Sequence, residues 1–199
     1  MDEKRILGAV FSLSISGRPP TIPELSGRLG TGAADTRKIV SACKSRGLLS
    51  LVGGRVTLTV EGRRRIKVVF IGGGFEVIHR GHLHTISRAK CLGDVLVAVL
   101  ARDSTIRTRK RREPVADENQ RLLLLSSLRQ VDAAILGVEG NIYDTLERVR
   151  PDVVALGYDQ HHLESDIERE GKARGIRLKV VRLDSPDPRI KTTALLRDL

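Results

Sequence analysis

The segment IGGGFEVIHRGH, residues 71–82, decides the fold of this chain. It follows the apolar run IKVVFI, residues 66–71, and leads into residues 81–91, where apolar side chains recur at helical spacing. This order predicts a buried strand, a glycine turn and a helix start. Such a corner collects unpaired backbone N–H groups and the imidazoles of His79 and His82 around one point, which suits an anionic ligand.

The alternation of strand and helix continues along the chain. We expect strands over residues 66–71, 94–100, 131–136, 152–157 and 176–183. We expect helices over residues 81–91, 117–129, 141–149 and 163–174. Alternation of this kind gives a parallel sheet with helices on both faces, so residues 66–199 are predicted to form an α/β domain with a Rossmann-like parallel sheet. Ligands bind such sheets beyond the carboxyl ends of the strands, where the glycine turn lies.

Residues 1–65 follow a different pattern and are predicted to form a separate small domain. The predicted elements are helices over residues 3–15, after Thr21 and over 33–46, then strands over 48–52 and 55–60 joined by Gly53-Gly54, then an exit segment over 61–65. This order resembles a winged helix-turn-helix, in which the helix over residues 33–46 would enter the DNA major groove. The resemblance rests on the pattern alone.

The charge of this first part is strongly basic. Residues 1–66 hold 12 Lys or Arg against 5 Asp or Glu, and the whole chain has a net charge of +11. A basic surface favours polyanions such as nucleic acid or nucleotide phosphates. The predicted helix over residues 33–46 carries Arg37, Lys38, Lys44 and Arg46. Two interpretations stay open, namely DNA binding and a solvated basic face on a module used for dimerisation, packing or regulation.

Composition and cysteine content exclude several classes of protein. There is no apolar run of about 18 residues, so we expect no membrane span. The first residues lack the apolar core of a signal peptide. Cys43 and Cys91 lie far apart in sequence and cannot by themselves form a zinc site. We therefore expect two reduced thiols, no metal site built by the protein, and a cytoplasmic location.

The spacing His79-x-Gly81-His82 resembles the signature of the HxGH nucleotidyltransferases, a cytidylyltransferase-like family. These enzymes transfer a nucleoside monophosphate from ATP or CTP to a phosphorylated acceptor and release pyrophosphate. The resemblance implies that His79 and His82 contact triphosphate oxygens and stabilise the transition state. The turn Gly73-Gly74-Phe75 is expected to bind the nucleotide, and Mg²⁺ is expected with the triphosphate. Dimers are common in this family, so a homodimer is a further expectation.

A basic segment follows the predicted strand over residues 94–100. Its pattern Lys110-x-Arg112-x-Pro114 resembles the mobile phosphate-binding loop of the cytidylyltransferase-like branch. We expect Lys110 and Arg112 to bind the pyrophosphate end of the nucleotide, and Lys110 to act in catalysis as well. Arg121 and Arg129, around the following helix, are secondary candidates for the same phosphates.

Three residues are candidates for contact with the phosphorylated acceptor. His84 lies two residues beyond the signature, where some relatives hold a basic residue for the acceptor phosphate. Glu76 stands where the family usually has Asp, and its longer arm is expected to shift a contact to the acceptor or to a metal. Arg129 opens a run that resembles the Arg-Tyr-Val-Asp element of glycerol-3-phosphate cytidylyltransferases.

Two later segments are expected to bind the nucleotide. Gly157, Tyr158 and Asp159 follow the predicted strand over residues 152–157, where a turn would face the base or the ribose. The run IKTT, residues 190–193, matches the family's terminal Ile-Ser-Thr-Thr element with Lys in place of Ser. The resemblance implies that Thr192 and Thr193 cap the last helix and bond phosphate oxygens.

The resemblance covers nearly all of residues 66–199 and is strongest to the archaeal FAD synthases, which transfer AMP from ATP to FMN. It is carried by the runs at residues 99–105, 131–137 and 151–160. We therefore predict FAD synthesis. The IKTT run favours an alternative, CTP-dependent transfer to glycerol phosphate or another phospho-alcohol. A hypothesis of another class is a DNA-binding regulator whose nucleotidyltransferase-like part only senses a nucleotide.

Overall fold

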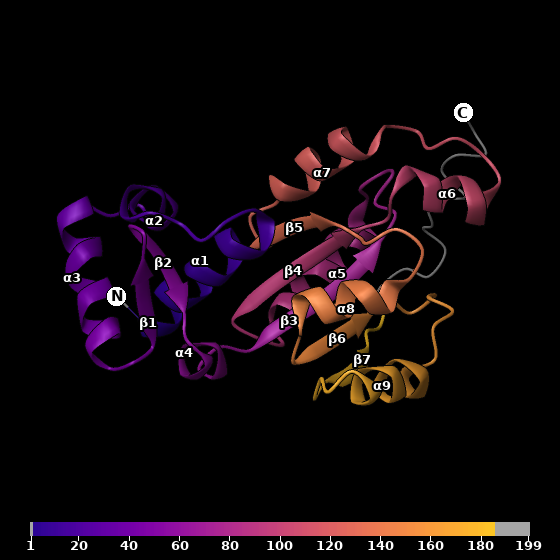
Figure 1. The fold of residues 1–199 in the computed structure, drawn as a ribbon. Helices are drawn as coiled ribbons and strands as arrows, with labels where there is room; N and C mark the ends of the chain where they lie inside the picture. Colours follow the sequence, from indigo (N-terminus) through magenta and orange to yellow (C-terminus); the bar gives the residue numbers. More distant parts are fainter. Residues whose placement is uncertain (1, 186–199) are drawn as a thin grey trace. The chain divides into compact units, whose positions relative to one another are not determined.

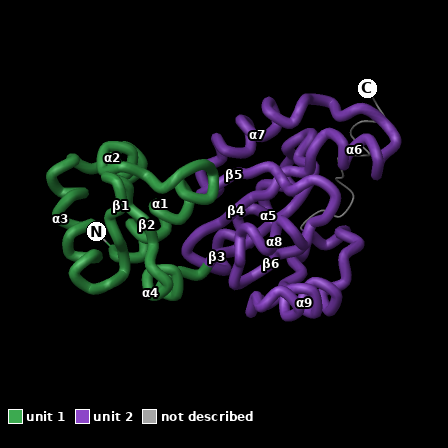
Figure 2. The backbone as a smooth tube through the Cα atoms, viewed as in Figure 1, with its two compact units in different colours: residues 1–67 green, residues 68–199 purple. Residues whose placement is uncertain are grey.

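The computed structural model describes residues 2–185 of the 199-residue chain. The chain divides into two compact units, residues 1–67 and 68–199 (Figure 2). Within the described part, no helix combines the length and apolar character that a bilayer crossing requires. The expected cytoplasmic location and the expected homodimer stay predictions.

The first unit consists of helices and one hairpin (Figure 1). Its elements are α1 (Glu3–Ser16), α2 (Ile22–Leu29), α3 (Ala33–Ser45), β1 (Leu49–Val52), β2 (Arg55–Leu58) and α4 (Val60–Arg64). The strands pair antiparallel, and their turn residues Gly53 and Gly54 have φ angles of 55° and 76°. Two positive φ angles in a two-residue turn match the twist of the strands and favour glycine. Buried side chains including Leu7, Leu25 and Val56 form the core.

The short helix α4 includes residue 60, which was expected to end a strand, and residues 61–64 of the expected exit segment. Thr59 caps this helix, since its hydroxyl accepts the Gly62 N–H at 3.0 Å. The three longer helices and the hairpin occur in the predicted order. Assignment of this unit to the winged helix-turn-helix class stays a prediction.

The second unit is a parallel sheet with helices. Its strands are β3 (Val68–Gly73), β4 (Val95–Leu100), β5 (Ala133–Leu136), β6 (Val153–Leu156) and β7 (Lys179–Arg182). Its described helices are α5 (Arg80–Lys90), α6 (Asp103–Lys110), α7 (Glu118–Ser126), α8 (Ile142–Val149) and α9 (Glu164–Ala173). All five strands are parallel and lie in the order β5-β4-β3-β6-β7. The predicted α/β fold with a Rossmann-like sheet is confirmed.

Helices cover both faces of this sheet (Figure 1). Ile86 of α5 and Leu125 of α7 join one buried cluster with alternate strand residues such as Ile71. The chain leaves β3 toward β4 and β5, then returns to place β6 and β7 on the other side of β3. Right-handed crossovers therefore place α8 and α9 over the opposite face, where Leu146 and Ile167 are buried.

The sheet order reverses beside β3, which makes its carboxyl end the switch point of the fold. Carboxylates fix the opposite, amino ends of two strands. Asp152 accepts the Val68 N–H at 2.7 Å, and Asp132 accepts the Leu96 N–H at 2.6 Å. These bonds fix how the strands are aligned at their amino ends. The loops at the carboxyl ends of the strands are thereby positioned over the switch point.

Most element boundaries differ from the expectation by one or two residues, and three differences are larger. The basic segment after β4 resembles a mobile loop in sequence, but its first part lies in helix α6, which ends at Lys110. Helix α7 ends at Ser126 rather than at residue 129, and β7 is four residues long rather than eight. The sequence of residues 103–110 shows no apolar periodicity, because Ile106 is the one buried residue of this helix.

A matched pair of glycine substitutions tests the packing of the first unit. A Cβ at Gly62 would lie 2.0 Å from the Leu48 carbonyl oxygen, whereas a Cβ at Gly27, inside α2, would meet nothing within 4 Å. We expect Gly62→Ala to lower the free energy of unfolding by about 2 kcal/mol, because the backbone must shift. We expect Gly27→Ala to raise it by about 0.5–1 kcal/mol. Denaturant titration measures both, and equal stabilities would contradict this packing.

Candidate active site

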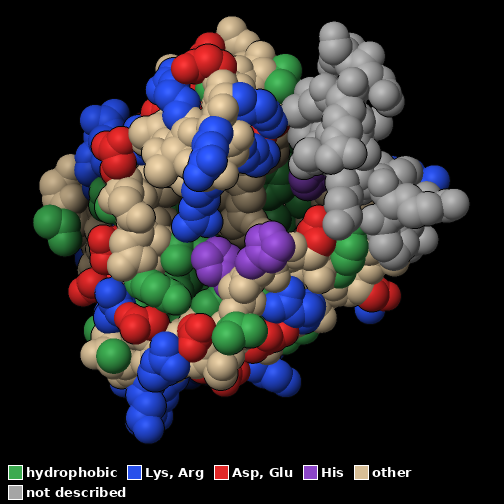
Figure 3. Space-filling model, turned by 90° about the vertical axis from the view of Figure 1, so that its right-hand side faces the viewer, with side chains coloured by type: hydrophobic (Ala, Val, Ile, Leu, Met, Phe, Trp, Pro, Cys, Tyr) green, Lys and Arg blue, Asp and Glu red, His purple; other side chains and the backbone are tan. Residues whose placement is uncertain are grey.

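A cavity of about 530 Å³ opens at the carboxyl ends of the parallel strands. Its walls come from the segments that follow β3, β4, β5 and β6, with the start of α5 and the end of α6. Figure 3 shows a hollow where histidine side chains lie close to lysine and arginine side chains. The cavity thus occupies the switch point at which α/β sheets bind ligands.

His79 and His82 lie side by side at the start of α5, with ring centroids 4.0 Å apart. His79 is the N-cap of this helix, and its Nδ1 accepts the Gly81 N–H at 3.2 Å. His82 follows one turn later and therefore points the same way. Its Nδ1 is buried and has no hydrogen-bond partner among residues 2–185. An unpaired buried polar atom is costly, so this nitrogen is suited to bind a ligand.

Both imidazoles are mainly neutral at pH 7. Burial lowers the pKa of His82 to about 4, and the neighbouring His79 adds to the effect. Burial also lowers the pKa of His79, while the Asp159 carboxylate partly opposes the shift in both rings. An anionic ligand would raise both pKa values, because it favours the charged imidazolium.

The turn after β3 is shaped by close contacts with its backbone. A Cβ at Gly73 would lie 3.0 Å from the Phe75 ring, and a Cβ at Gly74 would lie 3.7 Å from Lys110 Nζ. Phe75 has a φ of 45°, in the left-handed region that residues other than glycine rarely adopt. Its ring centroid lies 5.4 Å from that of His82. Glycine at position 73 therefore leaves room for the aromatic ring, whereas the contact at position 74 is an ordinary one.

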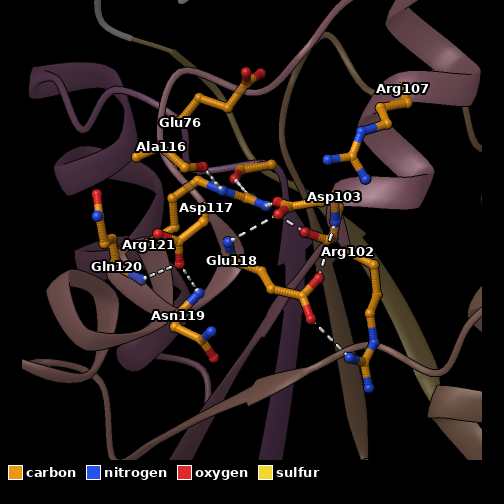
Figure 4. A network of polar contacts seen from close by, with 12 residues as sticks. Glu76, Arg102, Asp103, Arg107, Ala116, Asp117, Glu118, Asn119, Gln120 and Arg121 are labelled. Atoms are coloured by element: carbon orange, nitrogen blue, oxygen red, sulfur yellow. Dashed lines mark hydrogen bonds and ion pairs between the residues drawn. The ribbon is translucent and has the colours of Figure 1, made fainter.

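Arg121 supports this turn from inside the protein (Figure 4). Its side chain is 1% exposed, and Nη1 donates to the carbonyls of Gly74 at 2.6 Å and Ala101 at 3.1 Å. Nη2 pairs with Asp103 at 2.5 Å, and the Asp103 N–H donates to Glu118 at 3.0 Å. The sequence made Arg121 a candidate for phosphate contact. The structure instead uses it to satisfy buried backbone carbonyls.

Glu76 forms a buried ion cluster with two cations of the basic segment. Its carboxylate binds Lys110 Nζ, and its Oε1 lies 2.7 Å from Arg112 Nη1. Burial on its own raises the pKa of Glu76, but hydrogen bonds from Arg112 and Lys110 outweigh it, so the pKa is lowered. Lys110 lines the cavity, whereas Glu76 and Arg112 do not. The structure therefore does not place Glu76 in contact with an acceptor, nor Arg112 in the cavity wall.

Gln160 and Arg182 fix the turn that follows β6. Gln160 Nε2 donates to the Gly72 carbonyl at 2.6 Å, and its Oε1 accepts the Gly157 N–H at 3.2 Å. Arg182 Nη1 donates to the carbonyls of Gly157 and Gln160 at 3.1 and 2.9 Å. Residues 157–162, which line the cavity, are thereby tied to both β3 and β7.

Nine of the predicted site residues line the cavity. They are Gly73, Gly74, Phe75, His79, His82, Lys110, Gly157, Tyr158 and Asp159. Thr192 and Thr193 lie outside the described residues. The roles assigned to all these residues stay predictions.

Like Glu76, the other two expected acceptor residues do not line the cavity. His84 Nε2 instead lies 3.4 Å from Asp184 Oδ1. Arg129 is exposed and lies before β5, close to Asp132, whose backbone N–H bonds to Leu96 near the start of β4. Arg129 therefore lies near the amino ends of the strands, whereas the cavity lies at their carboxyl ends.

Four cationic or titratable residues line the cavity without having been expected there: Arg102, Arg109, His161 and His162. Arg109 belongs to the basic segment, but its direction depends on the helical phase of α6, which the sequence did not reveal. His161 and His162 directly follow a predicted turn, and that position was the available signal. The cavity is therefore more basic than the HxGH signature alone indicates.

The environment of His82 predicts a pH-dependent stability. The pKa of His82 is about 4 in the folded protein and about 6.5 in an unfolded chain, so the unfolded state takes up the proton first as the pH falls. Stability from the neutral ring is full above about pH 6.5 and is lost as the pH falls toward 4. We expect the thermal midpoint to fall more between pH 7 and pH 5 in the unmodified protein than in His82→Gln. Parallel pH profiles would contradict this.

Comparison with known proteins identifies the unit that carries this cavity. The model of the family described as cytidylyltransferase-like matches residues 70–197. The FAD synthase of Thermoplasma volcanium is 42% identical over 129 residues, which are 65% of this chain and 90% of that protein. The FAD synthase of Methanothermus fervidus is 47% identical over 114 residues, which are 56% of this chain and 78% of that protein.

A solved structure agrees with these relatives. The crystal structure of a lipopolysaccharide core biosynthesis protein from Thermoplasma volcanium is 43% identical, with a TM-score of 0.59. The match covers 61% of this chain and 99% of that one. The family match spans well over half of the chain and includes the histidine pair, the glycine turn and the turn after β6. The chain belongs to the cytidylyltransferase-like family and is a nucleotidyltransferase.

Proposed function

We propose that this protein transfers AMP from ATP to the phosphate of FMN, giving FAD and pyrophosphate. The observation that carries the proposal is the match to FAD synthases at 39–47% identity over most of their length. The cavity supports it, because neutral imidazoles, an ammonium group and a glycine turn meet at one place. These are the groups that bind and polarise phosphates.

In this reaction an oxygen of the FMN phosphate attacks the α-phosphorus of ATP. A new P–O bond forms, the bond from the α-phosphorus to the bridging oxygen breaks, and pyrophosphate leaves with the electron pair. Negative charge grows on the α-phosphate oxygens and on the leaving group, so catalysis needs positioning and fixed donors more than a protein nucleophile. His79, His82 and Lys110 take this role in the proposal.

The remaining walls suit the other parts of the two substrates. The turn at Gly157, Tyr158 and Asp159 lines the cavity beside the histidines and is proposed to bind the base or the ribose. Apolar side chains at Val138 and Ile142 line another wall, which suits a flat aromatic ring of the acceptor.

Mg²⁺ is proposed to enter with ATP. This ion keeps several water ligands and is usually held through substrate phosphates and one or two carboxylates. Asp159 is an acidic residue of the cavity wall and is a suitable carboxylate. Within residues 2–185 no group of three or more His, Cys, Asp or Glu is placed to hold a metal ion.

The proposal is tested by measuring pyrophosphate release with Mg²⁺, crossing ATP and CTP against FMN and glycerol 3-phosphate. We expect release with ATP and FMN together, and FAD as the product by chromatography. Release with CTP and glycerol 3-phosphate alone would contradict the proposal and favour cytidylyl transfer. We expect His82→Ala to lower kcat by about 100-fold, since one transition-state donor is lost. Arg129→Ala is the matched control. It should keep kcat, because Arg129 lies near the amino ends of the strands, away from the cavity.

We further propose that residues 1–65 form a winged helix-turn-helix that binds duplex DNA. The outward face of α3 carries Arg37 and Lys38 beside the small residues Ala34 and Ser41, all exposed. Cations neutralise phosphates there, and small side chains let the helix approach a groove. We expect replacement of Arg37 and Lys38 by Ser to reduce the slope of log affinity against log salt by about 2. Fluorescence anisotropy of a labelled duplex measures it, and an unmodified protein that binds no duplex would refute the proposal.

A further inference from the structure

Glu76 has a role that its expected contact with an acceptor does not describe. We propose that Glu76 is a positioning residue, which orients the ammonium group of Lys110 toward the cavity and lowers the positive charge that the triphosphate meets. The proposal rests on the proposed function, because Lys110 is taken to act on the transferred phosphate. It assigns Glu76 to the catalytic apparatus without any contact with substrate.

The carboxylate of Glu76 is completely used by its two partners. Its side chain has no exposed surface. Oε1 accepts Arg112 Nη1 at 2.7 Å, and Oε2 accepts Arg112 Nη2 at 3.0 Å as well as the Lys110 ammonium. Arg112 thus binds in the two-pronged geometry that fixes both oxygens, and the remaining direction of Oε2 is left for Lys110.

The cluster joins two segments that the sequence keeps far apart. Glu76 lies in the turn after β3, whereas Lys110 ends α6 and Arg112 follows it. On each side a residue other than glycine is left-handed, with φ of 45° at Phe75 and 54° at Arg111. This backbone is unfavourable for such residues and persists where the surroundings hold it. The ion cluster links the residues that directly follow these two positions, Glu76 and Arg112.

The ammonium group lies between the carboxylate and the cavity. A Cβ at Gly74 would be 3.7 Å from Lys110 Nζ and 3.8 Å from Glu76 Oε2, so both groups lie over this glycine. Lys110 lines the cavity and Glu76 does not. The charge of Lys110 also contributes to the lowered pKa of His82. Glu76 therefore holds Lys110 from behind, facing the site of the phosphates.

The cluster also sets the charge that an incoming triphosphate meets. Two cations and one buried carboxylate leave a net charge of +1, and both histidines are mainly neutral. Removing the carboxylate charge raises the net charge to +2 and attracts polyphosphate more strongly. It also frees Lys110 to adopt other rotamers, since the side chain loses its fixed partner. Binding and turnover are therefore expected to change in opposite directions.

The test compares Glu76→Gln with Glu76→Asp. For Glu76→Gln we expect tripolyphosphate, titrated calorimetrically, to bind several-fold more tightly, and kcat with ATP, FMN and Mg²⁺ to fall about tenfold or more. Glu76→Asp keeps the charge, so we expect polyphosphate affinity close to that of the unmodified protein and recovery of most of kcat. A merely structural role would weaken both properties and lower the thermal midpoint in parallel.

A double-mutant cycle with Lys110→Gln tests whether Glu76 acts through Lys110. We expect Glu76→Gln to lower kcat much less in the Lys110→Gln background, because the group it orients is already gone. Additive losses, or an unchanged kcat in Glu76→Gln, would overturn the proposal. If Glu76→Gln does not fold, the same cycle is run with Glu76→Ala, which also removes the carboxylate. Unmodified protein that forms no FAD would overturn the proposed function, whereas the tripolyphosphate titrations would still test the charge effect.

Discussion

The site depends on three successive carbonyl groups at the carboxyl end of the central strand β3, which bind three different segments. The carbonyl of residue 72 accepts the side-chain amide of Gln160, that of residue 73 accepts the Ala101 N–H, and that of residue 74 accepts the guanidinium of Arg121. These bonds tie the turn after β6, the end of β4 and the helix α7 to one glycine turn. Since those segments also form or support the cavity walls, its shape follows from how this turn is anchored.

Electrostatics divides the work between groups of different kinds. In the proposed reaction His79 and His82 serve as neutral donors, because burial lowers the pKa of both rings. Permanent charge comes from Lys110 and Arg109 at the end of α6. Because the imidazoles are neutral, the site without substrate avoids repulsion between several positive charges. When phosphate binds, it raises the pKa values of the imidazoles and so favours their positively charged form. Ground-state binding and transition-state stabilisation can thus be set by separate residues.

The sequence predicted those parts of the site that local pattern encodes. The turn at residues 72–75, the histidine pair and the turn at Gly157 all follow directly from strand ends and glycine positions, and they line the cavity. Arg121, Gln160 and Glu76 were assigned elsewhere or passed over, because each acts on a group 34 or more residues away in the chain. The periodicity of apolar residues along the chain contains no information about contacts between such distant residues. Whether a basic residue faces a phosphate or a buried carbonyl is decided by packing that only three dimensions reveal.

Phe75 shows why this turn joins fold and chemistry so closely. A glycine at this position would adopt a φ of 45° without cost, yet the chain places a large ring there. That ring packs over Gly73 and beside His82, so it excludes water from the side of the imidazole that burial keeps neutral. The same left-handed residue turns the chain so that the following Glu76 points inward to the two cations. One left-handed residue therefore places an aromatic ring beside the histidine and directly precedes the carboxylate that binds the lysine.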